Sequence, residues 1–157
     1  MSEKALYIGV GALVGAGLMH LYRQSASKST VSHLTPSVID SPVEVVNIDG
    51  KLCIYEHAGN ASNGEGSVSI AYVKVTEAIQ EAVQIPKFDE YVHILSGVMV
   101  VYVGEGISEK PITLTASAGQ TLHLPRGHKY RYTFPGPCNY LPVCLPAFSP
   151  DLAGRIE

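Results

Sequence analysis

The sequence has no block of basic residues and no acidic tail. Its formal net charge is −3, and acidic and basic side chains are spread along all 157 residues. Nucleic-acid-binding surfaces depend on clustered Lys and Arg, so this pattern predicts no nucleic-acid partner. Charged residues make up 16% of the chain, which is low for a soluble domain, whereas apolar residues make up 46%. The chain can therefore bury a core, and its length suits one domain.

Cysteine is scarce, and the familiar catalytic motifs are missing. Cys53, Cys138 and Cys144 form an odd set without C-x-x-C spacing. This excludes a disulfide framework and a zinc knuckle, and we expect free thiols in a reducing compartment, although a Cys138–Cys144 bridge stays open. No G-x-S-x-G, H-E-x-x-H, Walker or dinucleotide-binding motif is present. The sequence thus gives no positive sign of nucleophilic catalysis.

The N-terminal residues lack charge over a long apolar run. Ala5–Met19 reads ALYIGVGALVGAGLM, and with Tyr22 the run approaches the roughly 20 residues that span a bilayer. Gly11 and Gly15 are four residues apart, so a second helix could approach that face closely. We predict a transmembrane anchor over residues 1–23 that packs against other membrane-protein subunits through these glycines. A cleaved signal peptide and a helix packed in the fold are the alternatives.

The charges that flank this anchor are unequal. Lys4 precedes it beside Glu3, whereas Arg23 and Lys28 follow it. The positive-inside rule then mildly favours the C-terminal domain on the positive-inside face. The chain has no Arg-rich, acid-free presequence, which argues against a cleaved organellar peptide but allows import by an uncleaved signal. We predict a single-pass membrane protein, with a mitochondrial or plastid membrane as the candidate setting.

The rest of the chain divides into a linker and a β-rich domain. Residues 24–42 are rich in Ser, Thr and Pro and cannot bury a core, so they predict a linker before a domain over residues 43–157. Short β-branched runs then alternate with turn residues, and only Thr76–Ala82 has helical composition. This pattern predicts an all-β antiparallel sandwich or barrel. The expected strands are Val43–Ile48, Leu52–Tyr55, Val68–Val75, Glu90–Leu95, Val98–Val103, Ile112–Ala116, Thr121–Pro125, Tyr130–Phe134 and Tyr140–Cys144.

Two stretches resemble the paired motifs of the cupin superfamily. Asp89–Gly97 reads DEYVHILSG and is similar to the E-x-x-Y-V-L-x-G hairpin of motif one, with Glu90 seven residues before the glycine, like the family's metal-binding glutamate. Gly119–Gly127 reads GQTLHLPRG and matches the G-x(5)-P-x-G of motif two. The resemblance covers residues 68–144. It implies a single jelly-roll β-barrel of the RmlC-like class, preceded here by the predicted transmembrane helix.

The sequence departs from the family's metal-binding pattern. The family's H-x-H pair falls on Gln84 and Pro86, or on the residue before each, and its last histidine falls on Tyr130. Glu90 is the single strong ligand left of four, whereas a protein metal site normally needs three or four. We therefore predict no bound metal and no cofactor.

The segment Ile85–Gly97 is more similar to the ethanolamine-utilisation (EutQ-like) cupins, which open the hairpin with an acidic pair and lack the histidines. That subfamily has been linked to acetate-kinase-type chemistry. No Gly-rich phosphate loop or basic cluster accompanies the likeness here, so the resemblance implies the subfold and not the reaction. Many cupins pair their sheets, so it also implies a homodimer as a candidate assembly.

The resemblance places a candidate site at the barrel mouth. Glu90 would point into it, and burial would raise its pKa and suit it to proton transfer. The alternative is a carboxylate that ties the hairpin or faces solvent. Tyr130 stands at the vacated ligand position, and His128 lies in the loop after Gly127, where functional residues are common. Glu90, Tyr130 and His128 are the predicted catalytic residues.

Three further residues are predicted to bind a ligand. Gln84 stands at a vacated metal-ligand position, and His123 lies in the strand before Pro125. Arg126 flanks the motif-two loop and could hold an anion, with loop solubility as the alternative. His93 has the opposite strand parity to Glu90, so we expect it to lie on the other face of the sheet.

Two functions of different class remain. The first is a membrane-anchored cupin with a degenerate metal site, acting as a binding or accessory subunit of a membrane protein complex. The second is a metal-independent isomerase or lyase that uses Glu90, Tyr130 and a histidine. The sequence favours the first, a non-enzyme, because the glycines of the anchor, the lost ligands and apolar faces such as Val98–Val103 all suit a protein neighbour. A pocket with converging Glu, His and Tyr would favour the second, whereas a barrel filled by Phe, Leu and Tyr would favour the first.

Overall fold

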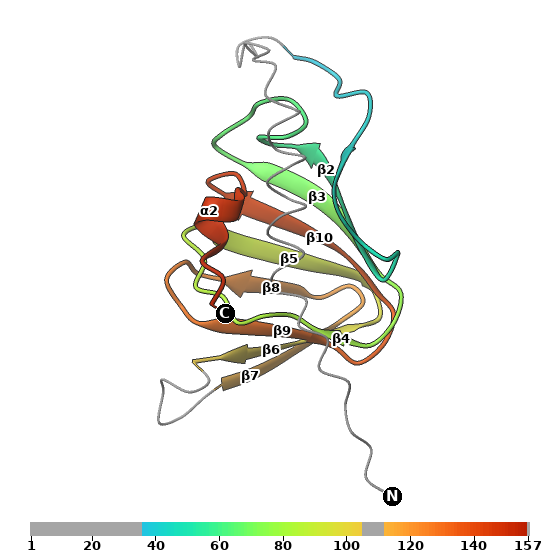
Figure 1. Cartoon of the computed structure of the whole chain (residues 1–157), viewed down its shortest axis with the longest axis vertical. Helices are drawn as coiled ribbons and strands as arrows, with labels where there is room; N and C mark the ends of the chain where they lie inside the picture. Colours follow the sequence, from blue (N-terminus) through green and yellow to red (C-terminus); the bar gives the residue numbers. More distant parts are fainter. Residues whose placement is uncertain (1–35, 105–111, 157) are drawn as a thin grey trace, which may run out of the picture.

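Two antiparallel sheets make up the part of the chain that the computed structural model describes, residues 36–104 and 112–156 (Figure 1). One sheet has six strands in the order β1-β2-β3-β10-β5-β8, and the other has four in the order β4-β9-β6-β7. The strands are β1 (Val43–Ile48), β2 (Leu52–Ala58), β3 (Ser69–Val75), β4 (Ile79–Gln80), β5 (Asp89–Ser96), β6 (Val98–Val103), β7 (Ile112–Ser117), β8 (Thr121–Leu124), β9 (Tyr130–Phe134) and β10 (Cys138–Leu145). The short helix α2 (Pro150–Ala153) follows the last strand.

The all-β prediction is confirmed. Residues 43–48, 98–103 and 130–134 form strands with the predicted bounds, and the other expected strands differ by a few residues at their ends. The helical composition of Thr76–Ala82 is misleading, because this segment contains β4. Ile79 pairs with Phe134 and Gln80 with Thr133 of β9, and such pairing overrides a weak local propensity.

The predicted anchor of residues 1–23 and most of the predicted linker lie outside the described residues. Between residues 36 and 104 and between 112 and 156, no helix has the length and apolar character needed to cross a membrane. The strand β1 begins at Val43, and the domain boundaries stay predictions.

Alternation along the strands decides which side chains fill the space between the sheets. On β5, Glu90, Val92 and Ile94 are buried, whereas Tyr91 and Leu95 are exposed. Deeply buried apolar side chains come from both sheets: Val73, Val92, Ile94, Met99, Val101, Leu124 and Phe134. Glu90 is thus a carboxyl group in a row of core residues.

The turn between β5 and β6 carries the chain from the six-stranded to the four-stranded sheet. Gly97 occupies this turn with φ +80°, a conformation that glycine adopts at little cost. A Cβ at this position would overlap the carbonyl oxygen of Pro137 and lie 2.8 Å from the Cα of Cys138. The motif-one glycine is therefore needed for its backbone conformation and for this close approach.

Candidate functional site in the barrel interior

Glu81 and Gln84 are brought into the barrel by the segment that begins with β4. The amide of Glu81 donates to the carbonyl of Tyr132 at 2.9 Å, one step beyond the last paired residue of β4. Gln84 and Tyr130 exchange both backbone hydrogen bonds, at 2.9 and 2.8 Å. Directly opposed residues of an antiparallel pair share a face, and both tyrosines are buried. Glu81 and Gln84 therefore face the interior with them.

The acidic group at the centre of this site is Glu90, whose side chain comes from β5 in the other sheet. The residue is 8% exposed, and the Tyr132 hydroxyl donates a 2.7 Å hydrogen bond to its Oε2 atom. Burial raises the pKa of Glu90 to about 7; the bond from Tyr132 opposes this rise, and the negative charge of Glu81 adds to it. A carboxyl group that can gain or lose a proton near neutral pH thus lies against a phenol inside the barrel.

Tyr130 was predicted as the phenol of the site, but its hydroxyl is used elsewhere. It donates to the carbonyl of Pro125 at 2.7 Å, while its ring stacks on Tyr132 with centroids 6.3 Å apart. Burial, with the charge of Glu90, raises the pKa of Tyr130 to about 12. The phenol that contacts Glu90 is Tyr132, which is not among the predicted site residues. The alternation in YRYTF could have indicated it, because residues 130 and 132 share a face.

Two further polar groups in the interior have no hydrogen-bond partner among the described residues. They are the hydroxyl of Tyr140, a residue 5% exposed, and the side-chain amide of Gln84, a residue 6% exposed. Among the described residues, only Ser62 Oγ is both completely buried and without a hydrogen-bond partner. The polar atoms of Tyr140 and Gln84 also lack a partner there, so they cannot be completely buried. These atoms therefore keep some accessible surface, and each borders space that a water-sized molecule can reach.

His123 does not join this group. Leu122 and Leu124, on either side of it in β8, are buried, so alternation places His123 on the exposed outer face. There its ring stacks on Tyr91 of β5, with centroids 4.5 Å apart. His123 therefore lies on the opposite face of the sheet from Glu90, and its predicted ligand-binding role stays a prediction.

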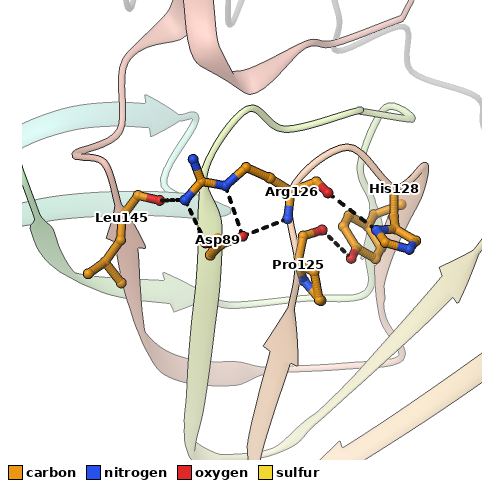
Figure 2. Close-up of polar contacts among 6 residues, drawn as sticks. Asp89, Pro125, Arg126, His128 and Leu145 are labelled. Carbon is orange, nitrogen blue, oxygen red and sulfur yellow. Dashed lines mark hydrogen bonds and ion pairs between the residues drawn. The ribbon is translucent and has the colours of Figure 1, made fainter.

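Arg126 and His128 lie outside the barrel, in the motif-two loop (Figure 2). The Arg126 guanidinium donates to Asp89 Oδ1 at 3.1 Å and Oδ2 at 2.6 Å, and to the carbonyl of Leu145 at 3.0 Å. Its hydrogen bonds to Asp89 hold the pKa of that carboxyl well below its usual range. The exposed His128 ring lies 3.3 Å from the Arg126 carbonyl oxygen and stacks against Tyr130. Arg126 thus fastens motif two to motif one, and among the described residues no histidine reaches Glu90.

The residues at the family's metal positions do not fit a transition metal. Of the four positions, Glu90 alone carries a strong donor, and the Tyr130 oxygen is already bonded to Pro125. In the described ranges, no cluster of three or more His, Cys, Asp or Glu could hold a metal ion. Such sites need three or four matched donors, so no step of the chemistry below runs through a metal.

Comparison by sequence relates the chain to a curated protein. No protein-family model matches the chain. It is 39% identical over 107 residues to the protein named endoribonuclease YbeY of Myxococcus xanthus, a match that covers 67% of this chain and 34% of that protein. The chain therefore spans about a third of the length of this curated relative.

The solved structures that match show the fold. Oxalate decarboxylase from Bacillus subtilis superposes with a TM-score of 0.60 at 11% identity, covering 78% of this chain and 33% of the enzyme. An RmlC-like cupin from Shewanella frigidimarina superposes with a TM-score of 0.55 at 14% identity, covering 74% of this chain and 93% of that protein. Clostridium difficile EutQ also matches at 15% identity over 64% of this chain and 74% of EutQ, with a TM-score of 0.48, which is too low to carry an argument. The chain has the RmlC-like cupin fold.

Proposed function

We propose that this cupin-fold chain binds a small molecule inside its barrel and exchanges a proton with it through Glu90. The observation that supports this function is the Glu90 carboxyl group, 2.7 Å from the Tyr132 hydroxyl and buried between the two sheets. Two unpaired polar side chains, Tyr140 and Gln84, face the same interior.

The cost of this polar interior argues against a purely structural role. Burial of the Glu90 carboxyl group disfavours its charged form, and an apolar replacement of similar shape is often neutral or stabilising. A barrel that serves stability alone would therefore fill this position with an apolar side chain. A bound molecule that pairs with the Glu90 carboxylate would offset this cost.

The protonation behaviour of Glu90 defines the chemistry. With a pKa of about 7, the carboxyl group is present in both forms at neutral pH, so it can donate or accept a proton, and such groups typically contribute about 10²–10⁴-fold to a rate. The Tyr132 hydroxyl fixes the carboxyl orientation by donating to one of its oxygens. An isomerase or lyase that moves a proton on its substrate could use Glu90 with the Tyr132 hydroxyl. Among the described residues, the expected histidine is not part of this group.

A ligand screen with paired tyrosine variants tests this function. We would titrate amines, sugars and carboxylic acids into the full-length chain in mild detergent with EDTA, and follow the tyrosine ring resonances by NMR. Tyr140→Phe removes an unpaired interior hydroxyl and should weaken the binding of a hit about tenfold. Tyr72→Phe is the control, because the Tyr72 hydroxyl bonds to Asn139 outside the barrel. Absence of any hit, or equal losses in the two variants, would contradict the proposal.

The activity in the name of the Myxococcus relative gains no support from this chain. The match covers 34% of that protein, so the shared region leaves most of its length unmatched. This sequence also has no basic cluster that would hold RNA.

A second candidate function is that of an accessory subunit tethered by residues 1–23. It is favoured by an apolar strip on the outer face of the six-stranded sheet, formed by Ile70, Val143 and Tyr91. Val143 pairs with Ile70 on one side and with Tyr91 on the other, and these two neighbours are 40% and 43% exposed. Exposed apolar strips often mark protein contacts. In this function the anchor would pack through Gly11 and Gly15 and the strip would face a subunit of the same organellar membrane complex.

Size measurement after gentle extraction tests the second function. The full-length chain should enter the membrane fraction and, in mild detergent, elute in an assembly larger than a dimer. Tyr91→Glu should shift the chain to a smaller species, whereas Thr121→Glu, at an exposed position of β8, should not. A species of two chains would instead support the homodimer, and free monomer alone would exclude the accessory role.

A further inference from the structure

The charges that face the barrel interior all have the same sign. Glu81 and Glu90 come from opposite sheets, and Tyr132 joins them, because its backbone pairs with Glu81 while its hydroxyl bonds to Glu90. None of the described Lys, Arg or His residues is buried. No positive charge is among the groups that shift the pKa of Glu90. The interior thus holds acidic groups, and no described basic side chain is buried beside them.

A basic group, the exposed Arg155, acts on one of these carboxyl groups. Its backbone pairs with Gln84. Its charge acts on Glu81, where it partly opposes the rise in pKa that burial causes. Glu90 therefore remains the carboxyl group without a compensating cation.

Stacked aromatic rings lie in the same interior. Phe134 stacks on Tyr140 with centroids 5.6 Å apart, and Tyr130 stacks on Tyr132 at 6.3 Å. Aromatic rings attract cations, an effect worth about 0.5–2 kcal/mol that is largest where water is excluded. Carboxyl groups beside rings suit an organic cation, whose charged nitrogen and apolar carbons need both.

Two polar side chains without hydrogen-bond partners in the described part of the chain also suit a ligand with an ammonium group. The Tyr140 hydroxyl oxygen and the Gln84 amide oxygen can each accept a hydrogen bond, and neither side chain has a partner among the described residues. A primary ammonium group has three N–H donors, which these oxygens and the Glu90 carboxylate could accept. An anionic ligand would instead meet two acidic side chains.

We propose that the molecule bound inside the barrel is a small organic ammonium cation, held by Glu90 and Glu81 with its carbon atoms against the rings of Tyr132 and Tyr140. This inference rests on the proposed function and names its ligand class. Binding would stabilise the Glu90 carboxylate and therefore release a proton near neutral pH.

A comparison of isosteric molecules with and without charge tests the ligand class. Choline and 3,3-dimethylbutan-1-ol have nearly the same shape but differ by one positive charge, and propylammonium and propan-1-ol form a second, smaller pair. Each would be titrated into the full-length chain at pH 8, with the tyrosine ring and Glu90 carboxyl resonances followed by NMR. We expect at least one cation to bind about tenfold more tightly than its neutral partner.

Variants and pH provide the controls. Glu90→Gln should weaken binding of the cation about tenfold, whereas Glu77→Gln, in the exposed pair with Lys51, should leave it unchanged. Affinity should fall from pH 8 to pH 5.5, as Glu90 gains a proton. The other groups in electrostatic contact with Glu90 all have raised pKa values: Glu81, Tyr130, Tyr132, Tyr140 and Cys144. The phenols and the thiol therefore stay neutral over this pH range. Glu81, like Glu90, gains a proton as the pH falls.

The outcomes separate the ligand class from the proposed function. Equal binding of a cation and its neutral partner would overturn the ammonium inference and leave interior binding intact. Failure of both cations, with a sugar or carboxylic acid binding in a Tyr140-dependent way, would do the same. Failure of every compound would overturn both.

Discussion

The wild-type domain is expected to lose stability as the pH rises from about 4.5 to 7, and Glu90→Gln should remove most of this loss. In the folded protein the pKa of Glu90 is about 7, whereas the ordinary pKa of a glutamate side chain is 4.5. Because the folded state binds the proton more tightly, the stabilisation is complete below pH 4.5 and is lost as pH rises through 7. At 1.36 kcal/mol per pH unit, the loss is about 3 kcal/mol.

Urea unfolding of the full-length chain in mild detergent, followed by circular dichroism from pH 4.5 to pH 8, measures this effect. Burial also raises the pKa of Glu56 and Glu81, so a smaller slope of the same sign should remain in the variant. Asp89→Asn is the control. Its lowered pKa places the Asp89 contribution below about pH 4, so the slope above pH 4.5 should be unchanged. Equal slopes in wild type and Glu90→Gln would show that Glu90 is not buried as described.

Gly97→Ala is expected to destabilise the domain by about 2–5 kcal/mol. The substitution combines a left-handed backbone, which costs a residue with a Cβ about 1–2 kcal/mol, with overlap of the new methyl group and the Pro137 carbonyl. The backbone must shift at the turn that joins the two sheets, and such overpacking typically costs a further 1–3 kcal/mol or so.

Gly119→Ala measures the cost of the left-handed backbone without a clash. Gly119 has φ +85°, similar to the +80° of Gly97, but no atom lies within 4 Å of its added Cβ. This variant should lose about 1 kcal/mol, the backbone cost alone. Urea midpoints of both variants at one pH give the comparison. Equal losses would mean that the close approach of Pro137 to Gly97 is not rigid.

The fold could be predicted because its signals are local. Short β-branched runs separated by turn residues mark β1, β6 and β9 with their observed bounds. Strand β4 could not be recognised, because two residues are too few to show the alternation of a strand. The pairing that forms it comes from β9, far along the chain. Composition around Ile79 favours a helix, and only tertiary pairing reverses that preference.

The candidate site was predicted in part. The motif resemblance selected Glu90 and Gln84, and both are buried. It could not select Tyr132 over Tyr130, because both face the interior and the choice depends on which hydroxyl reaches a carbonyl and which reaches a carboxyl group. Glu81 was missed for the same reason as β4, since the register with β9 turns it inward. Strand alternation alone would have placed His123 outside.

A direct titration of the Glu90 side chain by carbon-13 NMR, with Glu90→Gln to assign the resonance, tests the central claim. The account predicts a midpoint near pH 7 in the ligand-free wild-type chain. It also predicts a higher midpoint in Tyr132→Phe, which lacks the hydrogen bond that favours the carboxylate. A midpoint near 4.5 in the wild type would show a solvated or ion-paired carboxylate, and the proposal of a proton-exchanging binding site inside the barrel would be wrong.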